Sequence, residues 1–292
     1  MGNYTVREVT AKTIFSASGI PGIDWSINPY LGCRFGCKYC YAYFVGRFRH
    51  PDEAWGEYVD VKVNAVELFK MELKQKLAQS TKGEIGEIFF SAVTDPYQGL
   101  EAKYQLTRGC LEVLVAEKYH GRVSILTKAP LVTRDIDLFK RLPAIEVGLT
   151  VTSTGDPISR YLETYAPSHQ DRIKALQELN RAGIKTYAFV GPLLPHLAKK
   201  PAQLKLLFSL LKAAGVSYIF VEHLNLKPYI AERLLTYVKQ DKPELLADFE
   251  AAKSPDYRKE LGELIKTLAA EEDLPVAGGE AIHHPESGSW QG

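Results

Sequence analysis

Short apolar runs alternate with amphipathic stretches through the middle of the chain. Between about residue 85 and residue 225, five runs rich in β-branched and aromatic residues predict buried strands at 87–93, 123–127, 145–151, 185–190 and 217–222. A further short strand is expected in the run SINPY, residues 26–30. Apolar residues at helical spacing fill the intervals, so the alternation predicts an α/β fold with a parallel sheet.

Turn and cap residues mark the ends of the predicted helices. Ser168 with Asp171 three positions later is typical of a helix start, and Gly183 ends the apolar periodicity that follows. Pro201 opens the next helix and Gly215 closes it. The pattern amounts to about six strand–helix units. Right-handed crossovers would curl their sheet into a partial (β/α)6 TIM-like barrel, with its chemistry at the carboxyl ends of the strands.

The chain is expected to divide near residue 227. Residues 1–227 would form the partial barrel with an N-terminal extension, and residues 228–292 would add helices and a tail that pack on the barrel. Within this second part, Pro255 opens a stretch whose apolar residues recur at helical spacing. We therefore expect C-terminal helical decoration of the barrel.

Composition narrows the class of protein. Of 292 residues, 46% are hydrophobic and the formal net charge is +1, the mix of a globular protein with a large core. A net charge this small does not attract the protein as a whole to nucleic acid or to an anionic membrane. A site for a polyanion therefore has to be a local patch of positive charge. The sequence shows no secretory leader, no membrane-spanning run, and no GxGxxG, Walker or G-x-S-x-G motif. We expect a cytoplasmic protein without a membrane partner.

Three of the four cysteines, Cys33, Cys37 and Cys40, follow the first predicted strand with the spacing C-x3-C-x2-C. This spacing can place three thiolates on three corners of a cubane iron–sulfur cluster and leave the fourth iron open for chemistry. A structural zinc site with His50 or Cys110 as fourth ligand is one alternative, and buried or redox thiols are another. Zinc sites usually pair their ligands, and no second pair exists here, so the spacing favours the cluster. A purely electron-transferring cluster would need a fourth ligand that no nearby cysteine supplies.

The same motif, with aromatic Tyr39 before Cys40, resembles that of the radical S-adenosylmethionine (radical SAM) enzymes. Five runs of this chain resemble segments of proteins in the spore photoproduct lyase-like branch of that superfamily. They are NPYLGCRFGCKYCYA, FSAVTDPYQ, SILTKAP, GLTVTS and APSHQDRIKALQELNRAGI. The resemblance implies a [4Fe–4S] cluster whose open iron binds S-adenosylmethionine, and an electron donor such as flavodoxin or ferredoxin. One-electron cleavage of this cofactor would give a 5′-deoxyadenosyl radical that abstracts hydrogen from a substrate.

Several residues acquire roles through this resemblance. Lys128 matches a lysine that contacts the cofactor's carboxylate, and Thr94 beside Asp95 lies where the family binds the cofactor's amino group. Thr150 matches a serine near the cofactor. The structural alternatives at these positions are a surface lysine, a turn cap in TDPY and an ordinary strand threonine.

Two tyrosines flank the third cysteine, as in the lyase-like branch. Tyr39 would pack on the adenine, and Tyr41 would pass a hydrogen atom or an electron, although packing under the loop is an equal alternative for Tyr41. The branch has a cysteine hydrogen donor where this chain has Val93, so repair of spore photoproduct by that route is not expected. Cys110 lies on the apolar stripe of a predicted helix, and we expect it to be a packed core residue.

Cationic and aromatic residues alternate just after the cysteines. Arg47, Arg49 and His50 interleave with Phe44 and Phe48, a pattern that could seat nucleic acid or another phosphate-bearing substrate. A surface loop anchored by its aromatics is the alternative. Two functions therefore compete. One is a radical SAM enzyme whose candidate substrate is nucleic acid or a nucleotide-like molecule. The other is a non-catalytic, zinc-stabilised nucleic-acid-binding module.

Three histidines near the C-terminal end are candidate functional residues to which the sequence assigns no definite role. His223 follows the last predicted strand and would contact substrate if it points toward the barrel mouth, but a structural role is equally expected. His283 and His284 lie in the tail of residues 277–292, which is rich in Gly and Ser, and stay unassigned.

Overall fold

The computed structural model describes residues 4–81 and 83–284 and divides the chain into two compact units. Unit 1 comprises Met1–Gly36, Ala42–Gly148 and Arg181–Lys185. Unit 2 comprises Cys37–Tyr41, Leu149–Asn180 and Thr186–Gly292. The cysteine motif therefore contributes Cys33 to unit 1 and its other two cysteines to unit 2.

Unit 1 contains four strands of a mostly parallel sheet, in the order β2-β3-β6-β7. Strands β3, β6 and β7 run parallel, with Ile27 opposite Phe90 and Phe90 opposite Ile125, whereas β2 is antiparallel to β3. The bounds are Phe15–Ala17 for β2, Trp25–Ile27 for β3, Ile88–Phe90 for β6 and Val123–Thr127 for β7. All three side chains of β6 are buried, as its continuous apolar run predicts, and Phe15, Ile27, Val123 and Ile125 are buried in the other strands, whereas Ala17 of β2 is exposed.

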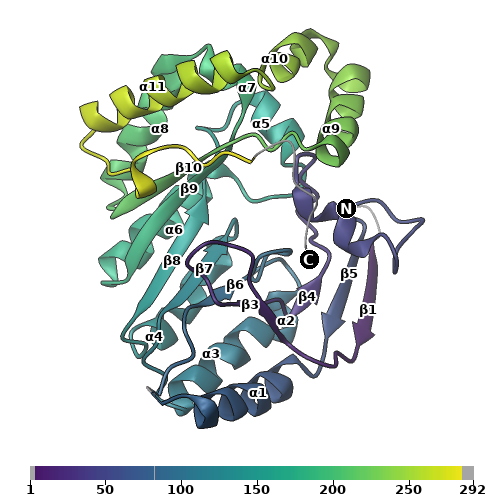
Figure 1. Cartoon of the computed structure of the whole chain (residues 1–292), viewed down its shortest axis with the longest axis vertical. Helices are drawn as coiled ribbons and strands as arrows, with labels where there is room; N and C mark the ends of the chain where they lie inside the picture. Colours follow the sequence, from purple (N-terminus) through teal and green to yellow (C-terminus); the bar gives the residue numbers. More distant parts are fainter. Residues whose placement is uncertain (1–3, 82, 285–292) are drawn as a thin grey trace. The chain divides into compact units, whose positions relative to one another are not determined.

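A second, smaller sheet in unit 1 joins β1, β5 and β4, with β5 in the middle. Strand β5 is parallel to β1 and antiparallel to β4, and the bounds are Thr5–Val9, Tyr58–Lys62 and Tyr30–Leu31 for β1, β5 and β4. Helix α1 lies beside α3 (Figure 1) and buries Phe69 and Leu73. The helices of this unit are α1 (Ala65–Gln79), α2 (Glu101–Tyr104), α3 (Leu106–Ala116) and α4 (Ile136–Phe139).

Strand β8 (Ile145–Thr150) begins in unit 1 and ends in unit 2. In unit 2, β9 (Lys185–Leu193) and β10 (Tyr218–His223) are parallel, with Tyr187 opposite Tyr218. The segment after the last helix continues this sheet, because Ile282 N donates to Val221 O (2.8 Å) and His223 N donates to Ile282 O (3.0 Å). The C-terminal segment thus runs along β10.

Helices α8 and α11 lie side by side in unit 2 (Figure 1). The helix that was expected to begin near Ser168 is α6, and the Ser168 hydroxyl accepts from Asp171 N at 3.1 Å. The helices of this unit are α5 (Pro157–Leu162), α6 (His169–Arg181), α7 (Pro195–Ala198), α8 (Pro201–Ala213), α9 (Pro228–Asp241), α10 (Leu246–Ala251) and α11 (Pro255–Glu271). No helix within residues 4–81 and 83–284 combines the length and apolarity needed to cross a bilayer.

The five predicted strands of the middle region are confirmed, as are the helices predicted after residue 228. The short strand predicted at residues 26–30 is confirmed for Ser26 and Ile27, which lie in β3, but β3 ends there and Tyr30 belongs to β4 in the other sheet. Pro29 has no amide hydrogen for a ladder, and the Asn28 side chain accepts from Ala92 N and Val93 N, both at 3.1 Å. The division of the chain near residue 227 stays a prediction.

Candidate active site

Cys33 is buried in unit 1, in a loop whose backbone is fixed on both sides of the cysteine. Gly32 precedes it with φ +85°, and a Cβ there would lie 2.5 Å from Tyr58 O, so only glycine fits. Thr94 Oγ1 donates to Gly32 O at 2.5 Å. The Thr94 hydroxyl therefore holds the cysteine loop. Its predicted contact with a cofactor amino group stays a prediction.

Gln98 also holds the loop that carries Cys33, and the sequence did not predict this role. It is fully buried, and its Nε2 donates to Gly32 O (3.2 Å) and to Thr94 Oγ1 (3.0 Å). Its Oε1 accepts from Arg34 N at 2.9 Å. One amide side chain thus satisfies backbone groups before and after Cys33. The only signal was the four-residue interval between Thr94 and Gln98, which is too common to single out.

Asp95 is buried and fixes the backbone at the carboxyl end of β7. Its carboxylate accepts from Thr127 Oγ1 (2.6 Å), Lys128 N (2.8 Å) and Tyr97 N (2.9 Å). Burial raises the pKa of the Asp95 carboxyl more than these hydrogen bonds lower it. The structure therefore brings two of the predicted cofactor residues together, with Asp95 bound to the backbone from which the Lys128 side chain extends.

The segment Cys37–Tyr41 belongs to unit 2, and its residues differ in exposure. Cys37 and Tyr39 are buried, Cys40 is half-buried, and Tyr41 is 39% exposed. The Tyr39 hydroxyl donates to Glu163, so its ring is fixed by a buried carboxylate. Burial raises the pKa of Tyr39 well above its usual value, and Glu163 adds to this shift, so the phenol keeps its proton.

Thr150 ends β8 and is buried, and its carbonyl oxygen accepts from Arg172 Nη1 at 3.1 Å. Arg172 and Glu163 are both fully buried and form an ion pair. Neither residue is predicted from the sequence, because charged side chains in and beside an amphipathic helix usually face water. The available signal was that Arg172 precedes Leu176 by four positions and so shares the apolar stripe of α6.

The loop Phe44–His50 of unit 1 exposes its tip and buries its end. Phe48 is 82% exposed, and the Arg47 guanidinium lies 4.5 Å from its ring centroid. His50 is buried instead, with its ring nitrogens 2.5 Å from Glu53 Oε2 and 3.0 Å from Asp60 Oδ1. His50 therefore anchors the loop. We expected His50, together with Arg47 and Arg49, to be able to seat a phosphate. The burial of the His50 ring does not agree with that expectation.

Cys110 is fully buried on α3, which confirms that it is a core residue. His223 is buried at the end of β10, and within the described part of the chain neither of its ring nitrogens has a hydrogen-bond partner. Burial, with His283 and Arg258 nearby, lowers the pKa of His223 to about 4. His283 stacks on His223 with ring centroids 3.9 Å apart, and His284 Nε2 lies 2.6 Å from Glu222 Oε1.

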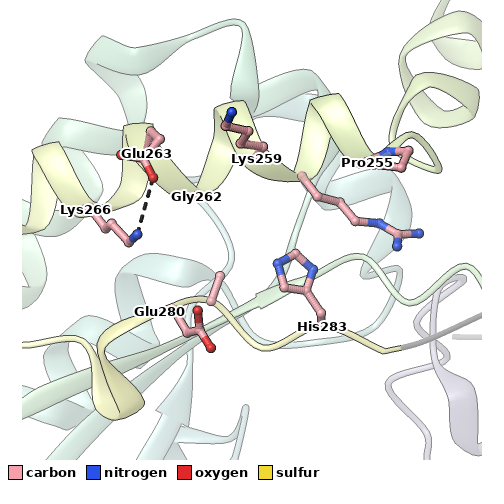
Figure 2. A pocket seen from close by; sticks show the side chains of 9 residues that line it. Pro255, Lys259, Gly262, Glu263, Lys266, Glu280 and His283 are labelled. Atoms are coloured by element: carbon pink, nitrogen blue, oxygen red, sulfur yellow. Dashed lines mark hydrogen bonds and ion pairs between the residues drawn. The ribbon is translucent and has the colours of Figure 1, made fainter.

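Figure 2 shows a cavity of about 340 Å³ in unit 2, between α11 and the segment around His283. Its wall carries mixed charge, and Lys266 pairs with Glu263 at 3.3 Å. None of the residues that the family resemblance singled out lines it. The lining residues are Pro255, Arg258, Lys259, Gly262, Glu263, Lys266, Glu280, Ala281 and His283.

The cysteines of the motif have the chemistry that an iron–sulfur cluster needs. All four cysteines of the chain are thiols rather than disulfides, and two of the three in the motif are buried. Within the described ranges, no group of three or more His, Cys, Asp or Glu side chains gathers as a site for a metal ion. The motif cysteines are divided between the two units, and their donor set, three thiols spaced C-x3-C-x2-C, fits the cluster.

Comparison with known proteins relates the chain to enzymes. The family model of the radical SAM superfamily matches residues 27–201. The chain is 34% identical to an uncharacterized protein of Methanocaldococcus jannaschii over 274 residues, which cover 94% of this chain and 96% of that protein. It is 28% identical over 212 residues to a radical SAM Nα-GlyT isomerase of Pseudomonas phage M6, covering 71% of this chain and 42% of the isomerase.

Among solved structures, spore photoproduct lyase complexed with dinucleoside spore photoproduct matches with a TM-score of 0.71 at 18% sequence identity. The match covers 93% of this chain and 81% of the lyase. This likeness shows the fold and confirms the expected α/β partial-barrel class. Because the family model spans more than half of the chain and the Methanocaldococcus relative matches nearly all of it, the chain belongs to the radical SAM superfamily, whose enzymes use a [4Fe–4S] cluster and S-adenosylmethionine.

Proposed function

We propose that this radical SAM enzyme acts on a nucleic acid or nucleotide-like substrate, with Cys33, Cys37 and Cys40 as the cluster ligands. When bound, the cluster and S-adenosylmethionine supply a carbon-centred radical that abstracts a hydrogen atom from the substrate. Membership of an enzyme superfamily decides against the non-catalytic zinc module. It also implies a reductant, for which a flavodoxin or ferredoxin is the candidate.

The chain's own residues would bind and orient S-adenosylmethionine. Lys128 offers an ammonium group to the cofactor's carboxylate, and Asp95 holds the Lys128 backbone in place. Thr94 and Thr150 offer oxygen atoms near the ends of β6 and β8, and Tyr39 offers its ring to the adenine. In each case the contact to the cofactor is proposed from the family resemblance.

Tyr41 is the candidate catalytic residue. It follows Cys40 directly, 39% of its surface is exposed, and burial of its phenol raises the pKa so that the hydroxyl keeps its hydrogen. The position of the lyase branch's cysteine hydrogen donor is held by Val93, whose side chain has no hydrogen to give easily. We therefore assign to Tyr41 the return of a hydrogen atom or an electron to the substrate.

One observation carries the choice of substrate, the exposed tip of the loop Phe44–His50. A phenylalanine that is 82% exposed beside an arginine combines a stacking surface for a base with a cation for a phosphate. The other end of the loop is anchored in the protein, because the buried ring of His50 also stacks on the ring of Tyr58 with centroids 3.9 Å apart.

The test measures 5′-deoxyadenosine formation by anaerobically reconstituted protein with dithionite, with and without a short single-stranded oligonucleotide. We expect the oligonucleotide to stimulate formation and its apparent KM to rise with salt. An Arg47→Ala/Phe48→Ala variant should raise that KM by about tenfold or more, since base stacking alone contributes about 1–3 kcal/mol. Cys33→Ala should form no product.

Met71→Ala serves as the matched control, because Met71 is 57% exposed on α1 of the same unit. This variant should keep the wild-type KM for the oligonucleotide. The proposed substrate class is wrong if the oligonucleotide neither binds nor changes product formation, or if the loop variant and the Met71 variant behave alike.

A further inference from the structure

A fully buried ion pair lies at the start of α6 in unit 2. Arg172 and Glu163 are both 0% exposed, and Arg172 Nη2 donates to Glu163 Oε2. The other donors of the guanidinium are used by backbone carbonyls. Nη1 donates to Thr150 O (3.1 Å), whereas Nε (3.1 Å) and Nη2 (2.8 Å) donate to Pro167 O. Burying two charges is costly, so a pair this well bonded points to a purpose beyond stability.

The Glu163 carboxylate connects this arginine to the segment that carries two of the motif cysteines. Its Oε1 accepts from the Tyr39 hydroxyl and from Thr152 Oγ1 (3.1 Å). Its Oε2 lies 3.4 Å from His169 Nε2. Tyr39 stands between Cys37 and Cys40 in the chain, so the carboxylate holds the short stretch between the two thiols.

The same segment is fixed at Lys38 by four further contacts. Lys38 N donates to Leu162 O (2.8 Å), and Lys38 O accepts from Arg233 Nη1 (2.6 Å). The Lys38 ammonium lies 4.8 Å from the ring centroid of Tyr161 and 4.6 Å from that of Tyr237. With both backbone groups and the side chain bound, the segment holds Cys37 at a set distance from the ion pair.

Arg172 interacts electrostatically with this segment. The guanidinium is a permanent cation, and its ion pair with Glu163, which also binds Tyr39, places this charge one side chain away from the segment that carries Cys37. A fixed positive charge close to a cluster stabilises added negative charge on that cluster. The reduction potential of an iron–sulfur cluster depends on such nearby charges.

We propose that the Glu163–Arg172 pair sets the electrostatic potential at Cys37 and thereby tunes the reduction potential of the bound cluster. This inference rests on the proposal that Cys37 is a cluster ligand. Arg172 raises the potential, because it favours the extra electron, and Glu163 offsets part of that effect while it orients Tyr39. Both are positioning residues that act on the cluster through its ligand segment.

The test is a redox titration of reconstituted protein, followed by electron paramagnetic resonance of the reduced cluster. Glu163→Gln keeps the shape and an acceptor for Tyr39 but removes a negative charge. At a fixed ambient potential we expect its ratio of reduced to oxidised cluster to rise about tenfold, since one charge about 10 Å away in an effective dielectric constant of about 20 has an effect of that order. For a one-electron couple this is a shift of about 59 mV.

A second variant, Glu163→Gln/Arg172→Met, removes both charges and leaves no unpaired buried ion. Its potential should lie below that of Glu163→Gln, and at or below that of the wild type, because it also loses the Arg172 charge, whose effect on the cluster we expect to be the larger of the two. Tyr39→Phe is the matched control, since it deletes the hydrogen bond and keeps both charges, and its potential should equal that of the wild type. A merely structural role would shift all three variants in one direction.

The outcomes separate this inference from the proposed function. If wild-type protein binds no cluster, or its resonance signal ignores added S-adenosylmethionine, the proposed function fails. If the wild type behaves as a radical SAM enzyme but Glu163→Gln leaves the potential unchanged or lowers it, only the inference fails. If Glu163→Gln does not fold, a double variant with a potential above that of the wild type overturns the inference.

Discussion

In unit 1, the backbone next to Cys33 is held by neutral side chains, Thr94 and Gln98. In unit 2, the segment with the other two motif cysteines is held by charged ones, above all Glu163 and its partner Arg172. Both arrangements bury polar groups completely, yet they differ in what the burial costs and in how far its effect reaches. Neutral hydrogen bonds fix positions locally, whereas buried charges also act on their neighbours through space.

This difference suggests a division of labour within one ligand motif. The neutral support around Cys33 secures the shape of its loop, which also needs Gly32 in a conformation open to glycine. The charged support adds an electrostatic field at the segment that it secures. If this interpretation is correct, damage to the charged side should be the more costly, and damage to the neutral side should change geometry without changing the potential.

The largest effect is expected for Arg172→Met. Without the guanidinium, the fully buried Glu163 would lose its ionic partner, which typically costs about 3–5 kcal/mol in the free energy of unfolding. Urea denaturation of the anaerobically purified protein measures this loss. Glu163→Gln/Arg172→Met should recover most of it, because no unpaired charge remains. Equal losses in the single and the double variant would contradict the assignment of the penalty to an unpaired charge.

An intermediate effect is expected for Gln98→Leu on the neutral side. The change keeps the volume but leaves Arg34 N without its acceptor and Gly32 O with one donor fewer. Unsatisfied buried groups of this kind cost about 1–3 kcal/mol. The same urea titration measures the loss, and a chelator should remove iron from the variant faster than from the wild type.

Gln75→Leu is the control for this prediction, since Gln75 lies exposed on α1 of the same unit. It should change neither stability nor iron retention. The comparison between the two sides is sharpened if Gln98→Leu leaves the cluster's potential at the wild-type value. A potential shift as large as that of Glu163→Gln would instead mean that the neutral groups also carry the electrostatic effect.

The sequence predicted the scaffold better than the site. Buried parallel strands are recognisable in the sequence as continuous apolar runs, and the cap at Ser168 indicated the start of α6. These elements were therefore predicted within a few residues. The small sheet of β1, β5 and β4 was not predicted, because the side chains of β1 are mostly exposed and the buried Asp60 interrupts the apolar run of β5. Short strands of this kind depend on their partners more than on their own sequence.

Within the site, the cysteine motif was readable because its spacing is itself the signal. The supporting groups were not, because burial of a charge depends on tertiary partners that lie far away in the chain. Arg172 and Glu163 are nine positions apart, and Tyr39 meets Glu163 across 124 positions. His50 was misjudged although Glu53 and Asp60 lie only three and ten positions away, because the sequence does not show that the chain folds these carboxylates onto its ring.

The smallest effect is expected for Asp95→Asn, and it concerns pH. Asp95 lies on the neutral side, where its hydrogen-bond donors are uncharged groups, and its pKa is raised in the folded protein mainly by burial. Between the unfolded value, about 3.9, and the raised folded value, the folded state binds more protons than the unfolded state. The contribution of Asp95 to the free energy of unfolding is therefore complete at pH values below the unfolded pKa. It is lost as the pH rises through the folded pKa.

Asparagine does not titrate, so the stability advantage of the wild type over Asp95→Asn should be largest at the acid end and shrink toward neutral pH. Urea titrations between about pH 4 and pH 8 measure this trend. Asp137→Asn is the control, because hydrogen bonding from Arg108 lowers the pKa of Asp137, so the wild-type advantage there should stay nearly constant over this range and shrink only below about pH 4. An advantage over Asp95→Asn that instead grows with pH would mean that the carboxylate is stabilised as an ion, and that this side of the motif depends on charge after all.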